Sequence, residues 1–300
     1  MDIGSLLHCF ADPGCITVQL VNALIIAMIL FLVASGLTLI LGVLGVLNFA
    51  HGSLYMMGAY FTYTVMKYIG NFGLALIIAP IGVGILGVIL ERFFIRRVYG
   101  LDELYQLLLT YAFILVFDDI VKLIWGIFDL SVTMPPAFRR PPISILGSIV
   151  PFYYLFIILV GALLVIGIWF FLSKTKFGKI INAAASDPEM LMCVGINVPL
   201  VYTSVFALGS LLAGLGAGLA APLRSMVPGM GFAVVIESFV VVVIGGMGNI
   251  LGTFGVALLF GLMRSFGILG FPFFEMGFIY LLMVVVLILR PSGLFGKLRI

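Results

Sequence analysis

Long stretches without a charged residue dominate the chain. No Asp, Glu, Lys or Arg occurs in four stretches, which cover residues 13–66, 141–173, 190–223 and 238–263. A helix needs about 20 apolar residues to cross a hydrocarbon core roughly 30 Å thick. Each stretch can hold at least one crossing, and the first can hold two. The apolar residues run continuously instead of alternating, so the pattern predicts membrane-spanning helices rather than barrel strands.

The apolar runs predict an all-α polytopic membrane protein with about eight or nine spans. The predicted spans cover residues 17–41, 50–69, 72–96, 104–127, 151–173, 200–222, 233–247, 250–267 and 274–290. The span at 233–247 is short for a full crossing and could be re-entrant. Eight spans with one half-helix is therefore the alternative count. We expect residues 1–300 to form a single transmembrane domain.

Composition excludes a soluble protein. The chain is 64% hydrophobic and 9% charged, with a mean hydropathy of +1.35, whereas a soluble domain has about 25% charged residues. Too few polar residues remain to cover a water-exposed surface. The net charge of +3 is small, and no basic tract predicts nucleic-acid binding.

The distribution of Lys and Arg predicts the orientation of the chain. Basic residues follow the third span and the fifth span and occur again at the C-terminus: Arg92, Arg96 and Arg97; Lys174, Lys176 and Lys179; Arg290, Lys297 and Arg299. Short loops rich in Lys and Arg face the cytoplasm. The N-terminus is then periplasmic and the C-terminus cytoplasmic. Arg139 and Arg140 oppose this bias, because they lie in the Pro-rich segment 129–150, which we expect to be an ordered external segment.

The polar stretch 174–199 between the fifth and sixth spans predicts a protruding cytoplasmic loop. Asp187 precedes Pro188, an order typical of a helix start, in which Asp caps and Pro takes the first helical position. Gly195 is a candidate helix end. We therefore expect a short helix, a break and a second short helix. Such a shape can dock into a partner's groove, although an ordinary loop would have the same composition.

Two Gly- and Asn-containing breaks interrupt the apolar pattern. One covers residues 45–52 between the first two spans, and the other covers residues 245–252 between the seventh and eighth spans. Broken helices at matching positions of two halves are typical of transport paths, but a chain with 36 glycines can produce such a match by coincidence.

Polar side chains inside apolar spans are candidates for a transport pathway, because they are costly in lipid unless paired or hydrated. The candidate substrate-pathway residues are Asn48, His51, Ser53, Glu237 and Asn249. For His51, a structural hydrogen bond is the interpretation we favour over a proton relay. Asp118 and Lys122 share a helix face, and we expect them to form an ion pair.

Motifs for catalysis or metal binding are missing from the sequence. Neither Gly178-Lys179 nor Gly296-Lys297 completes a nucleotide-binding G-x-x-x-x-G-K-[ST] motif, so we expect no ATP site and no enzymatic activity in this chain. The two histidines and three cysteines form no zinc pattern. Cys9 and Cys15 could form a disulfide if the N-terminus is periplasmic, or remain free thiols.

Five segments, in order along the chain, resemble the permeases of branched-chain amino acid ABC importers. They are the N-F-A-H-G break at 48–52, the L-E-R of 90–92, the loop from Lys176-Phe-Gly178 to Gly195-Ile-Asn197, the G-G-M-G of 245–248 and the R-P-S-G-L-F-G of 290–296. The likeness covers about residues 17–297. Of the two permeases in such systems, the chain resembles the shorter, H-type subunit.

This resemblance implies the fold of type II ABC importer permeases and a division of labour among several chains. It implies a second homologous permease, two cytoplasmic ATPases that bind ATP, a periplasmic substrate-binding protein and a location in the bacterial inner membrane. The ATPases would dock at the 174–199 loop, and the residues that match the family's coupling segment are Gly178, Ala184, Asp187, Glu189, Gly195 and Asn197.

Two alternatives to a branched-chain amino acid importer stay open at this point. Relatives in the family transport urea, short amides or aromatic acids, and Leu30, Phe31 and Arg97 depart from the common pattern. A stand-alone secondary transporter or channel, coupled to a gradient through Glu237 or Asp118, is the alternative of a different class.

Overall fold

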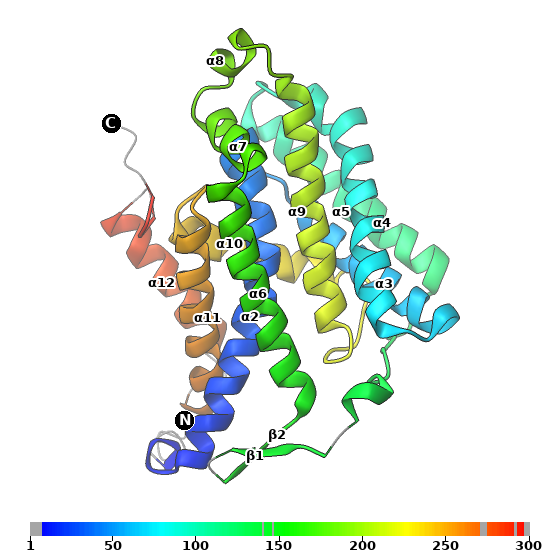
Figure 1. The fold of residues 1–300 in the computed structure, drawn as a ribbon, viewed down its shortest axis with the longest axis vertical. Helices are drawn as coiled ribbons and strands as arrows, with labels where there is room; N and C mark the ends of the chain where they lie inside the picture. The colour runs from blue at the N-terminus through cyan, green and yellow to red at the C-terminus, as the bar shows by residue number, and fades with distance from the viewer. Residues whose placement is uncertain (1–7, 140, 146, 271–274, 291–292, 297–300) are drawn as a thin grey trace.

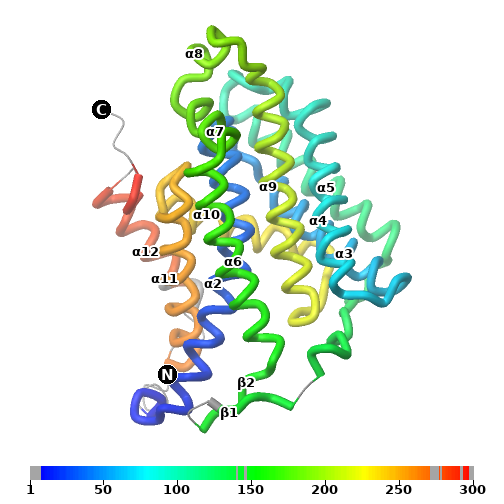
Figure 2. The backbone as a smooth tube through the Cα atoms, viewed as in Figure 1, coloured from blue at the N-terminus to red at the C-terminus, as the bar shows by residue number. Residues whose placement is uncertain are grey.

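The computed structural model describes residues 8–139, 141–145, 147–270, 275–290 and 293–296. The protein is an elongated bundle of helices with different structures at its two ends (Figure 1). The N-terminal end of α2 lies at the same end as the strands β1 and β2, and the short helices α7 and α8 project from the opposite end. The backbone trace shows α2 and α6 running along most of the bundle (Figure 2).

Nine helices in the described part of the chain correspond one to one with the nine predicted spans. They are α2 (Pro13–Leu44), α3 (His51–Ile69), α4 (Phe72–Phe93), α5 (Glu103–Trp125), α6 (Phe152–Lys174), α9 (Val198–Ala220), α10 (Met230–Gly245), α11 (Ile250–Gly270) and α12 (Glu275–Leu289). The remaining elements are η1 (Ile95–Val98), η2 (Pro136–Phe138), β1 (Ile143–Ile145), β2 (Ser148–Val150), α7 (Lys176–Ser186) and α8 (Pro188–Cys193). The prediction of an all-α polytopic protein with broken segments is confirmed.

Side-chain caps explain why several helices begin where they do. The Asp12 carboxylate accepts hydrogen bonds from the backbone amides of Gly14 and Cys15 at 3.0 and 3.3 Å, and Pro13 takes the first position of α2. The Asn71 side chain accepts from the Leu74 amide at 3.1 Å and starts α4. These residues satisfy amides that a helix leaves without an internal partner.

Length and hydropathy single out five of the described helices. In the described residues, α2, α4, α6, α9 and α11 are long and apolar enough to cross a membrane, and α10 is a shorter apolar helix. The 16 residues of α10 rise about 24 Å at roughly 1.5 Å per residue, which is less than a hydrocarbon core of roughly 30 Å. The prediction that the span at 233–247 is short for a full crossing is therefore confirmed.

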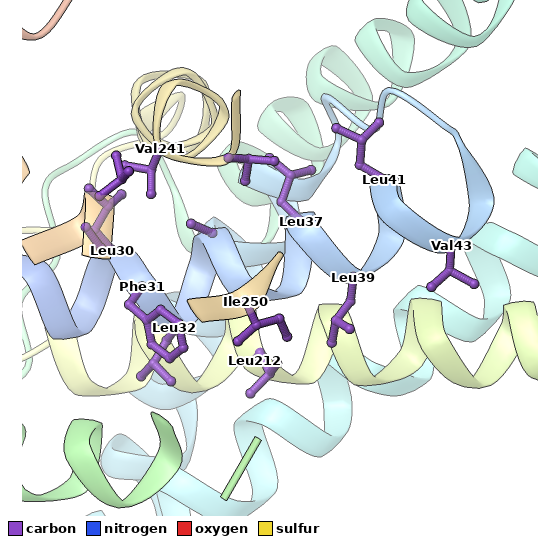
Figure 3. Packing of buried hydrophobic residues seen from close by; sticks show 14 of the residues in the cluster. Leu30, Phe31, Leu32, Leu37, Leu39, Leu41, Val43, Leu212, Val241 and Ile250 are labelled. Atoms are coloured by element: carbon purple, nitrogen blue, oxygen red, sulfur yellow. The ribbon is translucent and has the colours of Figure 1, made fainter. Parts of the chain in front are cut away.

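Helix α2 is the central element of the bundle. The most apolar 18-residue window of α2 is 83% buried inside the protein, whereas that of α6 is 17% buried. α2 packs against α6, α9, α10 and α11. Its side chains contribute to one core cluster with residues of the neighbouring helices, including Leu212 of α9, Val241 of α10 and Ile250 of α11 (Figure 3).

Small residues bring α9 against its neighbours. A β-carbon at Gly36 of α2 would collide with the backbone of Gly209, and one at Gly58 of α3 would collide with the backbone of Gly214. Without a hydrophobic driving force in lipid, helices associate through close packing, which such residues permit.

The segment between α5 and α6 is ordered and closes the N-terminal end of the bundle. β1 and β2 form an antiparallel pair, and the Phe138 ring lies 4.7 Å from that of Phe156 and 5.1 Å from that of Tyr153. The Ser148 hydroxyl donates to the Gly14 carbonyl at 2.6 Å. The prediction of an ordered segment at 129–150 is therefore confirmed for its described residues; Arg140 lies outside them.

The first turns of α3 and α10 cross with their backbones in contact. A β-carbon at Gly52 would collide with the Gly231 carbonyl oxygen, and one at Gly231 would collide with the Gly52 carbonyl. Next to this crossing, the ring of Phe49, which lies just before α3, stacks on that of Phe239 of α10, with ring centroids 5.7 Å apart. Two chain segments 179 positions apart (231 − 52) therefore depend on glycine at both positions.

Replacing Gly52 by Ala should destabilise the protein through this crossing. A methyl group at Gly52 forces the two backbones apart, and overpacking of this kind costs typically about 1–3 kcal/mol. Gly167→Ala in α6 is the matched control, because a β-carbon there meets nothing within 4 Å and Ala favours a helix by about 1 kcal/mol over Gly. Thermal unfolding of the purified protein in detergent measures both. Equal midpoints for the two variants would contradict the crossing.

Candidate functional site

The break between α2 and α3 places three candidate polar residues in the protein interior. Asn48, His51 and Ser53 are 2%, 0% and 1% exposed. His51 Nε2 lies 3.0 Å from the Val33 carbonyl of α2, as a donor to that oxygen. The Asn48 amide, His51 Nδ1 and the Ser53 hydroxyl have no hydrogen-bond partner among the described residues. The structural interpretation of His51 agrees with this bond, and a pathway role for the three residues stays a prediction.

The break between α10 and α11 is held by the C-terminal segment. Asn249 Oδ1 accepts from the Gly252 amide at 3.0 Å, and its Nδ2 donates to the Phe295 carbonyl at 2.8 Å. The Leu294 amide donates to the Ile244 carbonyl at 2.8 Å. Both ends of the Asn249 amide are therefore engaged by the protein. A pathway role for Asn249 also stays a prediction.

Glu237 lines a pocket between α2, α3, α10 and α11. Its Oε1 accepts from Arg264 Nη1 of α11 at 2.9 Å, and the two side chains are 12% and 15% exposed. Tyr55 of α3 and Arg224, in the connection between α9 and α10, line the same pocket, together with aliphatic side chains of α2. None of the other four predicted pathway residues lines this pocket.

In the sequence, Arg264 lies near the end of the eighth predicted span and is one of its few ionisable residues, whereas Arg224 follows the sixth predicted span. A charged group in or next to a span is itself a signal for a polar site in a membrane protein. The pairing of Arg264 with Glu237 could not be read from the sequence, because the two residues lie on different helices, 27 positions apart.

The predicted ion pair within α5 has a different acidic partner. Lys122 Nζ lies 3.0 Å from Asp119 Oδ1, at a spacing of three residues, and both side chains are exposed. The expected pairing of Lys122 with Asp118 at a spacing of four is therefore wrong. Both spacings put the residues on one helix face, and the side-chain conformation decided between them.

A buried carboxylate at the end of α4 holds together three segments that lie far apart in the sequence or in different elements. Glu91 is fully buried, and its Oε1 accepts from Arg96 Nε and from the Tyr99 hydroxyl, both at 3.0 Å. Its Oε2 accepts from Arg96 Nη2 at 3.0 Å and from the Thr203 hydroxyl of α9 at 2.8 Å. We call these four residues the Glu91 network.

Charge and burial keep the donors of the Glu91 network protonated. The hydrogen bond to Glu91 raises the pKa of Arg96, and burial together with the Glu91 charge raises the pKa of the Tyr99 hydroxyl well above its usual value. Arg96 also donates to the Pro199 carbonyl at the start of α9. The network therefore fixes the first turn of α9 to the end of α4.

The predicted loop contains the two expected short helices. The Asp187 carboxylate accepts from the Met190 amide at 2.9 Å and Pro188 begins α8. Gly195 follows α8 with φ +82°, while its amide bonds to the Met192 carbonyl and the Ile196 amide bonds to the Leu191 carbonyl. This pair of bonds is a Schellman motif, which requires a left-handed residue that glycine adopts without strain. Asp187 and Gly195 are confirmed as the start and end signals of α8.

Three further candidate residues fix the loop to the bundle. A β-carbon at Gly178 would collide with the end of α6, and Ala184 is 1% exposed on the face of α7 that packs against the core. The Asn197 side chain accepts from the Leu200 amide at 3.1 Å and starts α9. Glu189, by contrast, is exposed on α8. The roles of these residues in ATPase coupling stay predictions.

Comparison with known proteins decides the family. The family described as "Branched-chain amino acid transport system / permease component" matches residues 19–287. The chain belongs to this family. No solved structure matches the chain significantly.

Several relatives that are named as branched-chain amino acid permeases match the chain over almost its full length. The permease protein BraD of a high-affinity branched-chain amino acid transport system in Pseudomonas aeruginosa is 28% identical, over 93% of this chain and 95% of its own. LivH of Escherichia coli is 24% identical over the same shares. A probable LivH permease of Methanocaldococcus jannaschii is 27% identical over 92% of this chain and 91% of its own.

Family membership establishes the kind of molecule. The chain is an integral inner-membrane protein and the permease component of an ABC transporter. A permease of this kind works with ATPase and substrate-binding components. The resemblance to the H-type subunit agrees with the names of the relatives.

Breaking the Glu91 network from either side should have unequal effects on stability. Arg96→Ala leaves the fully buried Glu91 carboxylate without its main cation, and such a loss costs about 3–5 kcal/mol. Glu91→Gln leaves Arg96, whose side chain is 34% exposed and can be hydrated, so the loss is smaller. Thermal unfolding in detergent measures both variants.

Arg97→Ala is the control for the Glu91 network, because Arg97 is an exposed neighbour in the same turn. Its midpoint should equal that of the wild type. A larger loss for Glu91→Gln than for Arg96→Ala would show that Glu91 is not the buried centre of the network.

Proposed function

We propose that the chain is one of two permease subunits in an ATP-driven importer of branched-chain amino acids. The other components would be a second homologous permease, two cytoplasmic ATPases and a periplasmic binding protein that delivers the substrate. The observation that carries the proposal is the full-length similarity to permeases named for branched-chain amino acid transport. The projecting α7–α8 segment favours the presence of ATPase partners, because a stand-alone carrier would have no need of such a segment.

The end of α8 has the character of a docking surface. Met190, Met192 and Val194 are 63%, 52% and 68% exposed, at the tip of the segment that projects furthest from the bundle (Figure 1). Because α8 lies beyond the spans, these apolar side chains face water unless a partner covers them. An amphipathic helix that inserts apolar side chains into a groove is a common mode of recognition. Glu189 on the same helix adds a charge to this surface.

A short, hydrogen-bonded connection leads from α8 into the membrane domain. Asn197 starts α9 four residues after the end of α8, and Arg96 binds the Pro199 carbonyl and the Thr203 side chain in the first two turns of α9. Gly178 and Ala184 pack α7 against the bundle. A displacement of α8 by a partner would therefore act on α9 and, through the Glu91 network, on α4.

We propose that the N-terminus is periplasmic and the α7–α8 end cytoplasmic. The basic residues after α4 and those after α6 lie at the α7–α8 end, since Arg96 contacts the start of α9 and α6 leads directly into α7. Cys9 and Cys15 form a disulfide at the opposite end, and disulfides persist in oxidising compartments. The two observations are independent and favour one orientation. Arg290 is described, but Lys297 and Arg299 lie outside the described residues.

The double variant Met190→Glu/Met192→Glu should release the ATPases from the transporter. Two charges at the tip of α8 would have to be desolvated in an apolar groove, which opposes binding. Affinity purification of the tagged chain from its native membrane, followed by mass spectrometry, should recover the second permease and lose both ATPases. Charge reversal at Glu189 should also weaken the binding of the ATPases. Asp187 is unsuitable for this test, because its carboxylate caps α8.

Met190→Leu/Met192→Leu is the matched control for the α8 tip, since Leu and Met have similar volume and polarity. This variant should keep both ATPases. Wild-type protein that purifies alone, in a detergent that preserves such complexes, would contradict the importer and favour a stand-alone transporter. Glutamates that leave the complex intact would remove α8 as the docking site.

Native cysteines at the two ends test the orientation. In intact spheroplasts, a membrane-impermeant maleimide should label Cys15 only after treatment with an impermeant reductant, because Cys9 and Cys15 are oxidised. Cys193 is exposed on α8 and should react only after lysis. Cys193→Ala identifies the second label. Labelling of Cys193 in intact spheroplasts would reverse the orientation.

A further inference from the structure

We infer that the pocket between α2, α3, α10 and α11 recognises an aliphatic α-amino acid by its charged groups, with Arg224 binding the carboxylate and Glu237 the ammonium group. This inference rests on the proposed function, because it states how the substrate is recognised within the permease after delivery. We call this pocket the zwitterion pocket.

The charges of the zwitterion pocket suit a carboxylate. Glu237, Arg264 and Arg224 all line it, and two cations with one anion give a formal charge of +1. Glu237 and Arg264 bind each other, whereas Arg224 takes part in none of the ion pairs found among the described residues. A guanidinium group binds a carboxylate through two parallel hydrogen bonds. Arg224 is therefore the cation available to an arriving carboxylate.

The connection that carries Arg224 is fixed at two points. Met226 exchanges two backbone hydrogen bonds, at 2.7 and 3.0 Å, with Leu130 in the segment between α5 and α6. The Tyr153 hydroxyl donates to the Leu219 carbonyl at 2.7 Å, just before the connection begins. A backbone that is already ordered loses little entropy when its side chain binds a ligand.

Arg264 acts on Glu237 as a positioning residue. A carboxylate inside a membrane protein is costly unless it is paired, and Arg264 provides that partner from α11 at 2.9 Å. An ionised carboxylate has about four acceptor positions, so Glu237 can bind an ammonium group while it keeps its bond to Arg264. If the Glu237–Arg264 pair served only to link α10 and α11, a second arginine in the same pocket would not be needed.

Apart from Tyr55 of α3, the rest of the pocket wall is aliphatic. One face of α2 contributes Ile25, Ile26, Ile29, Leu30 and Val33, at the spacing of a helix stripe, and Val234 of α10 extends the wall. The cavity volume of the pocket is about 50 Å³ in this conformation, which is room for a few water molecules and less than the roughly 300–1,000 Å³ common for small ligands. An amino acid therefore fits only after the surrounding helices have moved apart, as a transport cycle requires. Urea and short amides have no carboxylate for Arg224 and no apolar body for this wall.

The test uses the complete importer, with its second permease, ATPases and binding protein, in proteoliposomes. Arg224→Gln should lower L-leucine uptake per ATP hydrolysed by about 10- to 100-fold, the range expected for the loss of a hydrogen bond to a charged group. Arg224→Lys should restore part of the uptake, because it keeps the charge and loses the paired geometry. Arg139 is an exposed arginine in the segment between α5 and α6. The control variant Arg139→Gln should therefore take up L-leucine as the wild type does.

Each outcome of the uptake assay separates the inference from the proposed function. Wild-type uptake by Arg224→Gln would overturn the zwitterion pocket and leave the importer intact, with Arg224 as a surface arginine only. A wild-type complex that neither imports L-leucine nor hydrolyses ATP in response to the loaded binding protein would overturn the proposed function itself.

A labelling measurement decides the case where the Arg224 variants fail to assemble. Val234→Cys, in a Cys193→Ala background, places one reactive thiol in the pocket for a small cationic methanethiosulfonate reagent. L-leucine should slow its modification, whereas leucinamide, which lacks the carboxylate, and 4-methylpentanoate, which lacks the ammonium group, should not at the same concentration. Equal protection by all three compounds, or none by L-leucine, would overturn the inference.

Discussion

Lipid cannot form hydrogen bonds with a peptide backbone, and this constraint governs the whole structure. A break in a membrane helix is tolerated only where protein surrounds it. Both breaks of this chain meet that condition. The first lies beneath α10, whose Gly231 contacts Gly52, and the second is bound by the C-terminal segment through Asn249 and Ile244.

The same constraint restricts where charge can lie. Glu91, at one end of the bundle, is buried with two cationic or hydroxyl donors on each carboxylate oxygen. Glu237, within α10, is bound by Arg264 from the neighbouring helix. The two sites differ in accessibility: Glu91 is closed to any ligand, whereas Glu237 faces a pocket with a second arginine. The first has the character of a structural joint and the second that of a binding site.

The two sites lie on elements that the proposed transport cycle would have to connect. α9 begins directly after α8, is held by the Glu91 network at its first turn, and leads into the connection that carries Arg224. A partner at α8 and a substrate at Arg224 would thus act on opposite ends of one helix. The glycine contacts of α9 with α2 and α3 allow close packing of these helices.

The sequence by itself determined the spans, the two breaks and the limits of α8. A membrane helix satisfies its own backbone, so its length is set by a local apolar run, and caps such as Asp187 and Gly195 act on amides and carbonyls within a few residues. The motifs, in their fixed order along the chain, were sufficient to identify the family. Only the tertiary structure decided which charges meet: Glu91 with Thr203, 112 positions away, Glu237 with Arg264, and Lys122 with Asp119 rather than Asp118. Hydrophobic periodicity carries little information on these pairs, because helices that are apolar on most sides give no preferred face for packing. The contacts are set by shape, through the glycines at which the backbones approach.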